Sequence, residues 1–206
     1  MLYPKIREYC SDLSQHYDEI SEERKALLTQ LAAYISEKIK ASLPVNLVYI
    51  CTHNSRRSHF GQVWARVSAV FYGFSVNTFS GGTEATAFNA NAIKALQAAG
   101  LRVETNGSGN NPLYRVYFDE DLPAVDCFSK VYDHPANPAR DFAAVMTCGE
   151  AEQNCPFIPG AELRIATTYE DPKAFDGTPE QDAAYNKRCR QIALESLFVF
   201  SLLKKL

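Results

Sequence analysis

Residues 46–58 read Asn46-Leu47-Val48-Tyr49-Ile50-Cys51-Thr52-His53-Asn54-Ser55-Arg56-Arg57-Ser58. The apolar run before Cys51 is typical of a buried strand, and it leads directly into the pattern Cys-x5-Arg-Ser. Backbone N–H groups in such a loop form a nest for an anion, and a following helix contributes its positive end. Arg57 can hold two oxygens of a tetrahedral anion, and the same positive charge favours the reactive thiolate of Cys51. The spacing therefore predicts an oxyanion-binding loop beneath a nucleophilic cysteine.

The whole loop is expected to take part in anion binding. The predicted oxyanion-binding residues are Thr52, His53, Asn54, Ser55, Arg56, Arg57 and Ser58. The alternative is a core cysteine beside a surface arginine, but the preceding strand, the following helix pattern and the adjacent Ser58 favour the loop. His53 either tunes the thiolate or lies at the rim, and the sequence does not separate these two roles.

Strands and helices alternate from Val45 onward, which predicts an α/β fold with a parallel sheet and helices on both faces. After the first strand, the sequence predicts strands at residues 74–80, 113–118 and 142–147, and a strand-like run at 163–167. Residues 104–112 are polar and rich in Gly and Asn, which predicts a loop. Helices are expected directly after the Cys51 loop, at residues 91–99, and from a capping box at Thr178 and Gln181 to Leu206. The first of these helices should bury Phe60, Val63, Trp64, Val67 and Phe71.

Residues 1–44 are predicted to form an N-terminal helical extension, ahead of a main domain at residues 45–206. The apolar stripe of its first helix contains Ile6, Tyr9, Cys10, Leu13 and Tyr17. Its second helix is capped by Ser21 and has an apolar face of Leu27, Leu28, Leu31, Ile35 and Ile39. These faces either pack on the main domain or form a dimerisation surface, because an amphipathic stripe does not name its partner.

The composition excludes several classes of protein. With 206 residues and 46% apolar residues, the chain suits one globular domain with an appendage. The net charge is −3 and there is no basic run, so nucleic acid is not an expected partner. No apolar run is long enough to span a membrane, and the first residues lack a signal-peptide core. We therefore expect a cytoplasmic protein whose six cysteines are mostly thiols with redox or catalytic chemistry.

A second pair of cysteines follows the strand predicted at residues 142–147. Ligands in parallel sheets bind beyond the carboxyl ends of the strands, so Cys148 is expected to meet Cys51 at one edge of the sheet. In one straight helix, the Cα atoms of Cys148 and Cys155 would lie about 10 Å apart. A disulfide needs a Cα separation of about 4.4–6.8 Å, so a bridge would require the segment to bend or unwind. The alternative is a pair of unrelated buried thiols.

A carboxylic acid facing the loop is the remaining candidate for catalysis. Asp171 precedes Pro172 and follows the strand-like run; it either protonates a leaving oxygen or makes an ordinary turn. The other cysteines, Cys10, Cys127 and Cys189, have no partner signal and are predicted to be packing residues. The other histidines, His16, His59 and His134, show no metal-ligand spacing, so neither a metal nor another cofactor is predicted.

The loop from Cys51 to Ser58, on a strand-to-helix turn, resembles the low-molecular-weight phosphotyrosine phosphatases. The later Cys148-x6-Cys155-Pro156 segment and Asp171-Pro172 look more like the thiol-recycled arsenate reductases that share that fold. The resemblance covers roughly residues 45–206 and implies a four-stranded parallel sheet flanked by helices. It departs from the usual pattern in its N-terminal helices, in the length of residues 104–140, and in His53 and Arg56 of the loop.

The resemblance implies reduction of arsenate to arsenite through a Cys51–Cys148–Cys155 relay, with Arg57 and Asp171 as further catalytic residues. The expected partners are an arsenate or phosphate oxyanion and thioredoxin or another thiol reductant. One alternative is a protein-tyrosine phosphatase that forms a phosphocysteine at Cys51. A second alternative is a non-catalytic oxyanion-binding or redox-sensing module.

Overall fold

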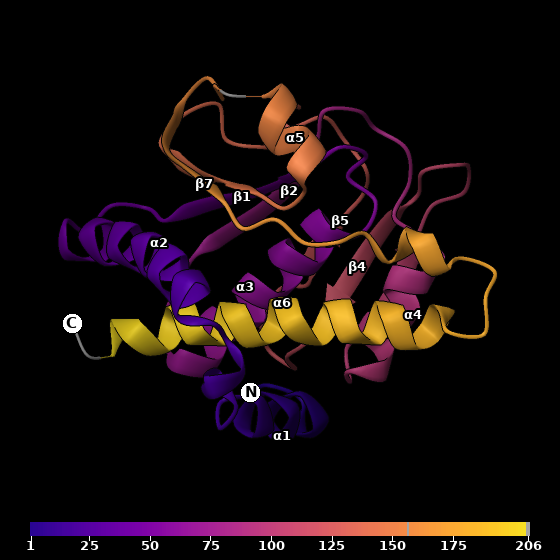
Figure 1. Ribbon diagram of the computed structural model, residues 1–206, viewed down its shortest axis with the longest axis horizontal. Helices are drawn as coiled ribbons and strands as arrows, with labels where there is room; N and C mark the ends of the chain where they lie inside the picture. Colours follow the sequence, from indigo (N-terminus) through magenta and orange to yellow (C-terminus); the bar gives the residue numbers. More distant parts are fainter. Residues whose placement is uncertain (156, 205–206) are drawn as a thin grey trace.

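A four-stranded parallel sheet lies at the centre of the computed structural model, which describes residues 1–155 and 157–204 (Figure 1). Its strands, in spatial order, are β2 (Asn77–Gly82), β1 (Asn46–Cys51), β6 (Phe142–Met146) and β7 (Ala161–Ala166). The predicted four-stranded parallel sheet is therefore confirmed. Pro156 and the predicted end of the last helix at Leu206 lie outside the described residues.

Both faces of the sheet are covered, so its central strands are apolar on both sides. Along β1, Leu47 and Tyr49 point into a large core, whereas Val48 and Ile50 point into a smaller cluster with Met146. This alternation follows from the two-residue period of a strand, and burial on both faces is usual for parallel sheets. Cys51 and Cys148 both belong to the smaller cluster, which places them on the same side of the sheet.

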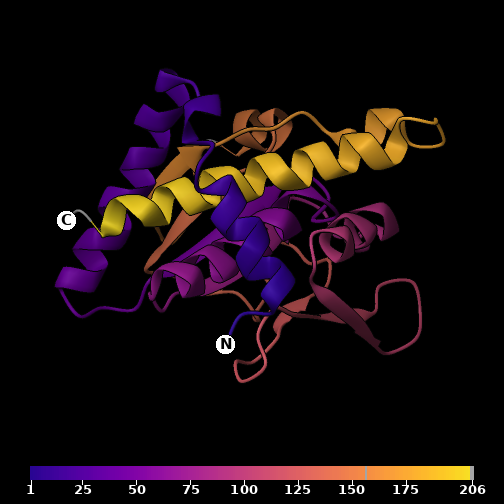
Figure 2. The ribbon, with the colours of Figure 1, turned by 90° about the horizontal axis from the view of Figure 1, so that it is seen from below.

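The helices divide between the two faces. On the large-core face, α3 (Arg57–Tyr72) packs along α6 (Gln181–Leu203), and α6 is also contacted by α1 (Pro4–Leu13), α2 (Glu22–Lys40) and α4 (Ala90–Ala98) (Figure 2). The short α5 (Gly149–Asn154) packs near the ends of β1 and β6. No helix among the described residues is both long and apolar enough to cross a bilayer.

The N-terminal helices share the large core with the rest of the chain. Ile6, Cys10 and Leu13 of α1 and Leu28 and Ile35 of α2 are buried in that core. Between the two helices lies a short 3-10 turn, η1 (Tyr17–Glu19). The predicted N-cap at Ser21 is confirmed, because its side chain accepts a hydrogen bond from the backbone N–H of Arg24.

A second, three-stranded antiparallel sheet was not predicted. It consists of β3 (Arg102–Asn106), β4 (Leu113–Tyr117) and β5 (Val125–Cys127). The prediction that residues 113–118 belong with the parallel strands is therefore wrong, and the loop predicted at 104–112 begins only after Asn106. Val116 is buried at the centre of this sheet, whereas Arg102 and Glu104 are exposed. A strand with one solvated face has many polar residues, and its composition resembles that of a loop.

The predicted capping box of the last helix is also wrong. α6 begins at Gln181, and the side chain of Glu180 before it makes no capping hydrogen bond. The Thr178 hydroxyl instead donates to the carbonyl of Phe175, and the Gln181 side chain accepts from the N–H of Gly177. The two residues thus stabilise the turn after the 3-10 helix η2 (Pro172–Phe175), which lies next to the predicted acid.

Candidate active site

The loop between β1 and α3 has the geometry of an anion nest. It begins at Cys51, the last residue of β1, and ends at Arg57, the first residue of α3. No N–H group of residues 53–57 donates a hydrogen bond to an acceptor among the described residues. Backbone donors in a buried loop require partners, and a tetrahedral anion is an acceptor that several converging N–H groups can share.

A chain of hydrogen bonds ends at the sulfur of Cys51. The backbone N–H of Lys130 donates to Asn54 Oδ1 at 2.9 Å, which orients the Asn54 amide. Asn54 Nδ2 then donates to Ser58 Oγ at 2.8 Å, and Ser58 Oγ lies 3.1 Å from Cys51 Sγ. Because the Ser58 oxygen already accepts a hydrogen bond, its own proton is free to point at the sulfur. Ser58 therefore supplies a hydrogen-bond donor directed at the sulfur of the candidate nucleophile.

Two backbone features keep the loop in this shape. Asn54 has a φ of 42°, a left-handed conformation that asparagine tolerates better than most residues. Gly82, at the end of β2, lies so close to the loop that a Cβ atom there would meet the Thr52 carbonyl oxygen at 2.6 Å and the Asn54 nitrogen at 2.7 Å. Only glycine therefore allows the end of β2 to lie this close to the backbone of the loop.

Arg57 and Asp171 lie together beside the loop. Arg57 is 9% exposed and donates from Nη1 to the Tyr169 carbonyl at 2.9 Å and from Nη2 to Asp171 Oδ2 at 2.6 Å. Arg57 Nε is buried and has no hydrogen-bond partner among the described residues. One prong of the guanidinium fork is thus unpartnered, and the other is held by Asp171. A small hollow at this point is lined by Cys51, His53, Ser55, Arg56, Arg57 and Asp171.

Three of the loop residues that line the hollow have polar side-chain contacts with other parts of the protein. Arg56 donates from Nε to the Tyr185 hydroxyl at 2.8 Å, and Ser55 donates to the Ala87 carbonyl. His53 lies at the rim, 41% exposed, with Nε2 3.7 Å from a carboxylate oxygen of Glu84. These residues can serve the anion through their backbone N–H groups. Besides its contact with Tyr185 of α6, the Arg56 side chain lies 3.9 Å from Asp171 and 3.6 Å from Asp176.

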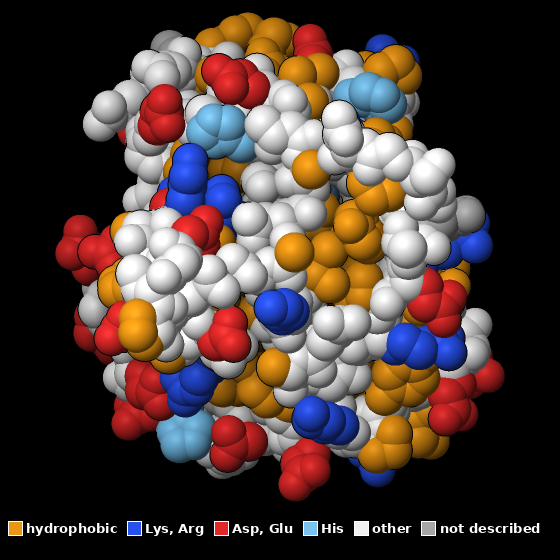
Figure 3. Space-filling model, turned by 90° about the vertical axis from the view of Figure 1, so that its right-hand side faces the viewer, with side chains coloured by type: hydrophobic (Ala, Val, Ile, Leu, Met, Phe, Trp, Pro, Cys, Tyr) orange, Lys and Arg blue, Asp and Glu red, His pale blue; other side chains and the backbone are white. Residues whose placement is uncertain are grey.

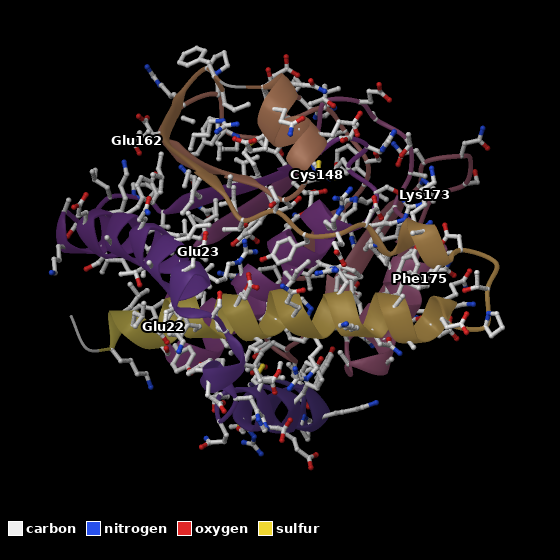
Figure 4. All side chains as sticks on the ribbon, viewed as in Figure 1. Glu22, Glu23, Cys148, Glu162, Lys173 and Phe175 are labelled. Carbon is white, nitrogen blue, oxygen red and sulfur yellow. The ribbon has the colours of Figure 1, made fainter. Side chains whose placement is uncertain are left out.

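Cys148 lies beside the loop, and Cys155 lies at the other end of α5. The Cys148 sulfur is 3.3 Å from Thr52 Oγ1, and it accepts a hydrogen bond from Ala151 N as the N-cap of α5. The Thr52 hydroxyl donates to Glu150, so the thiol of Cys148 supplies the proton in its contact with Thr52. Cys155 is the C-cap of the same helix and is half-buried. Figure 4 shows Cys148 at the end of α5 that faces the loop.

Comparisons with known proteins agree with this arrangement. The arsenate reductases of Bacillus licheniformis and Bacillus subtilis are each 28% identical to this chain over 144 residues, which is 70% of this chain and 86% of theirs. A low-molecular-weight phosphotyrosine phosphatase of Vibrio cholerae has a TM-score of 0.53 at 11% identity, with 78% of this chain and 97% of that protein covered. The low-molecular-weight protein tyrosine phosphatase of T. tengcongensis has a TM-score of 0.50 at 15% identity, with 79% and 99% covered.

The chain has the low-molecular-weight phosphotyrosine phosphatase fold. Its sequence relatives are named arsenate reductase, so the resemblance stated from the motifs is confirmed. No protein-family model matches the chain. Sequence reasoning missed Lys130 and Tyr169, whose backbone groups hold Asn54 and Arg57; main-chain contacts of this kind leave no signal in residue type.

The remaining thiols are buried away from this site. Burial raises the pKa of Cys10, Cys127 and Cys189 to about 12 in each case. At neutral pH these three side chains are protonated and unreactive, as expected of packing residues. Among the described residues, no group of His, Cys, Asp and Glu side chains has an arrangement that could hold a metal ion.

His59, in the first turn of α3, gives the fold a predictable acid sensitivity. Its ring is fully buried against Phe88, and burial together with the nearby charge of Lys130 lowers the pKa of His59 to about 3. Below pH 6.5 the unfolded chain takes up a proton at this position and the folded chain does not. The free energy of unfolding therefore decreases as the pH is lowered. Between pH 6.5 and 4.5 we expect titration at His59 alone to lower the free energy of unfolding by about 2 kcal/mol.

Urea unfolding at pH 7.5, 6.5, 5.5 and 4.5 measures this loss. A His59→Asn variant should lose stability less steeply across the same range, because asparagine does not titrate. An identical pH dependence in the two proteins would contradict the assignment.

Proposed function

We propose that this protein reduces arsenate to arsenite, with Cys51 as the nucleophile and Cys148 and Cys155 as the thiols that carry the oxidation away. The observation that carries the proposal is the position of Cys148, whose sulfur is 3.3 Å from the side chain of Thr52, the residue after Cys51. A phosphatase of the same fold needs no second thiol at this place. The relatives named arsenate reductase, which the chain covers over 86% of their length, support the same conclusion.

Anion binding uses the unpartnered donors of the loop. Arsenate is nearly isosteric with phosphate, so the N–H groups of residues 53–57 suit either anion. Arg57 can hold two oxygens of the anion through Nε and Nη2. Nε has no partner, and Nη2 would give up its hydrogen bond to Asp171 and donate to the anion instead. Asp171 then lies next to the bound anion, where its carboxyl group can protonate a leaving oxygen.

Two thiols act in turn to reduce the arsenic atom. The Cys51 thiolate attacks As(V), an As–S bond forms, and one arsenate oxygen leaves as water after protonation by Asp171. Cys148 then attacks the Cys51 sulfur, which forms the Cys51–Cys148 disulfide and breaks the As–S bond. The electron pair of that bond stays on arsenic, so As(V) leaves as As(III) in arsenite while the two thiols are oxidised.

Cys155 completes the relay. Its thiolate attacks Cys148, which frees Cys51 and leaves a Cys148–Cys155 disulfide for an external dithiol such as thioredoxin to reduce. The two residues cap opposite ends of α5, so this bridge requires the six-residue helix to unwind. The half-buried position of Cys155 makes it the most accessible of the three sulfurs to a protein reductant.

A second candidate is hydrolysis of phosphotyrosine, which the fold and the Arg57–Asp171 pair also support. It would use Cys51, Arg57 and Asp171 without the other two cysteines. The segment after Asp171 and Pro172 continues with Lys173, whereas phosphotyrosine phosphatases usually place aromatic residues there. Figure 4 shows Lys173 and Phe175 on η2, beside the site.

One experiment separates the two candidates. The purified protein is assayed for arsenate-dependent oxidation of NADPH with thioredoxin and thioredoxin reductase, and in parallel for hydrolysis of phosphotyrosine. We expect arsenate-dependent turnover that requires thioredoxin. Phosphotyrosine hydrolysis without arsenate turnover would favour the phosphatase instead.

A further inference from the structure

Tyr169 connects three parts of the candidate active site through its backbone. Its N–H donates to the carbonyl of Thr147, the residue before Cys148. Its carbonyl accepts the 2.9 Å hydrogen bond from Arg57 Nη1, and Asp171 follows two residues later. The position of this one peptide segment therefore sets the direction of the Arg57 guanidinium.

The side chain of Tyr169 is anchored on the opposite side, away from the loop. Its hydroxyl donates to Glu195 Oε2 of α6 at 2.7 Å. The same oxygen accepts from Arg24 Nε at 2.9 Å, and Arg24 Nη2 lies 2.8 Å from it. The Arg24 guanidinium also lies over the Tyr169 ring, with Cζ 4.7 Å from the ring centroid. Arg24 belongs to α2, so the N-terminal extension reaches the segment that holds Arg57.

The charge balance of this cluster depends on Arg24. Glu195 is 3% exposed, and Arg24 is the only cationic side chain that forms an ion pair with it among the described residues. Burial and the Glu195 carboxylate raise the pKa of Tyr169, which keeps its phenol protonated as a donor. Without Arg24, the buried Glu195 carboxylate would keep only the neutral hydrogen-bond donors Tyr169 and Gln191. Arg188 would remain nearby, with Cζ 5.9 Å from the Tyr169 ring centroid, but it forms no ion pair with Glu195 among the described residues. A buried carboxylate that loses its ion-pair partner is strongly unfavourable, so the cluster would rearrange.

We propose that Arg24 is a positioning residue for the oxyanion site. Through Glu195 and the Tyr169 ring it fixes the Tyr169 carbonyl, and this carbonyl holds Arg57 in the direction that an anion requires. The inference rests on the proposed function only in that Arg57 binds the oxyanion. It makes α2, in the N-terminal extension, part of the machinery of the site rather than a separate appendage.

A matched control exists between α6 and η1, the short turn that precedes α2. Arg190 of α6 makes two contacts with Glu19, at 2.6 and 2.8 Å, and so also joins the N-terminal segment to α6. It has no contact with Tyr169 among the described interactions. Arg190→Ala therefore tests general docking of the extension, whereas Arg24→Ala tests the specific route to Arg57.

The test measures how well inorganic phosphate protects Cys51 from alkylation by iodoacetamide, with the full-length protein and mass spectrometry of the labelled peptide. We expect Arg24→Ala to raise the phosphate concentration for half-protection by about tenfold, within the range of long-range coupling effects. Arg190→Ala should change it by less than twofold. Arg24→Lys should recover part of the loss, because it restores the charge without the forked contact. The KM for arsenate should rise with the same order among the variants.

A second substitution keeps the proposal testable if Arg24→Ala does not fold. Tyr169→Phe retains the ring and the backbone carbonyl and removes only the bond to Glu195, and it should weaken phosphate protection in the same direction. In the double variant with Arg24→Ala the losses should be less than additive. Folded Arg24→Ala, or Tyr169→Phe, with wild-type protection would overturn the proposal. If Arg24→Ala weakens phosphate protection as expected but the wild-type protein shows no arsenate turnover, the reductase function is refuted and this inference stands.

Discussion

Cys51→Ser is expected to abolish arsenate reduction and any phosphatase side activity, with a loss of at least about a thousandfold in turnover. The serine hydroxyl occupies nearly the same space, and its contact with Ser58 can persist, so the loop should keep its shape. The loss comes from chemistry, because a hydroxyl is far less ionised than a thiol among the same donors. Turnover assays with arsenate and with a small phosphate ester measure it, and circular dichroism checks the fold.

Alkylation of the wild-type protein provides the matching control. Iodoacetate at neutral pH should label Cys51 first and leave Cys10, Cys127 and Cys189 unmodified, since burial raises the pKa of each of these three to about 12. Preferential labelling of Cys10 or Cys127 would argue strongly against Cys51 as the nucleophile of this site.

The features that could be predicted from the sequence are those that residue type and spacing determine directly. The strand before Cys51, the helix after Arg57 and the nearness of Cys148 follow from apolar periodicity and from the geometry of a parallel sheet. The helical faces before residue 44 are predicted for the same reason, and the structure places their apolar residues in or against the shared core, except Ile39, which is 38% exposed.

The features that the sequence did not predict depend on main-chain contacts and on long-range pairing. Lys130 orients Asn54 through a backbone N–H, and Tyr169 holds Arg57 through a backbone carbonyl; neither contact requires a particular side chain. The pairing of Val116 with Val103 and Val125 joins strands whose exposed residues resemble a loop. The direction of Arg56, toward α6 rather than the anion, is decided by Tyr185, more than a hundred residues later.

One face of the molecule carries charged side chains of both signs. On the face in Figure 3, acidic side chains gather mainly at the left edge, basic side chains are scattered, and no continuous basic area is visible. In the proposed function, Arg57, which is 9% exposed, and the loop N–H groups are the donors that would bind the anion. Two residues after Cys155, the apolar side chain of Phe157 is 75% exposed.

The two relay cysteines provide the second large effect. Cys155→Ser should limit the protein to about one turnover and trap a Cys51–Cys148 disulfide, because no thiol remains to release Cys51. Cys148→Ser should stop arsenite release by the intramolecular route, whereas hydrolysis of a small phosphate ester should survive. Cys10→Ala, which removes a buried thiol outside the site, should leave turnover intact. Single-turnover assays and non-reducing peptide mapping distinguish these outcomes.

The same relay predicts a structural change on oxidation. Cys148 and Cys155 cap the two ends of α5, and a regular helix holds their Cα atoms about 10 Å apart, too far for a disulfide. Oxidation to the Cys148–Cys155 bridge should therefore unwind α5, and the amides of residues 149–154 should lose protection in hydrogen exchange relative to the reduced protein. Cys155→Ser treated with the same oxidant should keep that protection. If Cys148→Ser and Cys155→Ser both retained full thioredoxin-dependent arsenate turnover, the three-cysteine relay would be ruled out, and hydrolysis through a phosphocysteine at Cys51 would become the better account of the site.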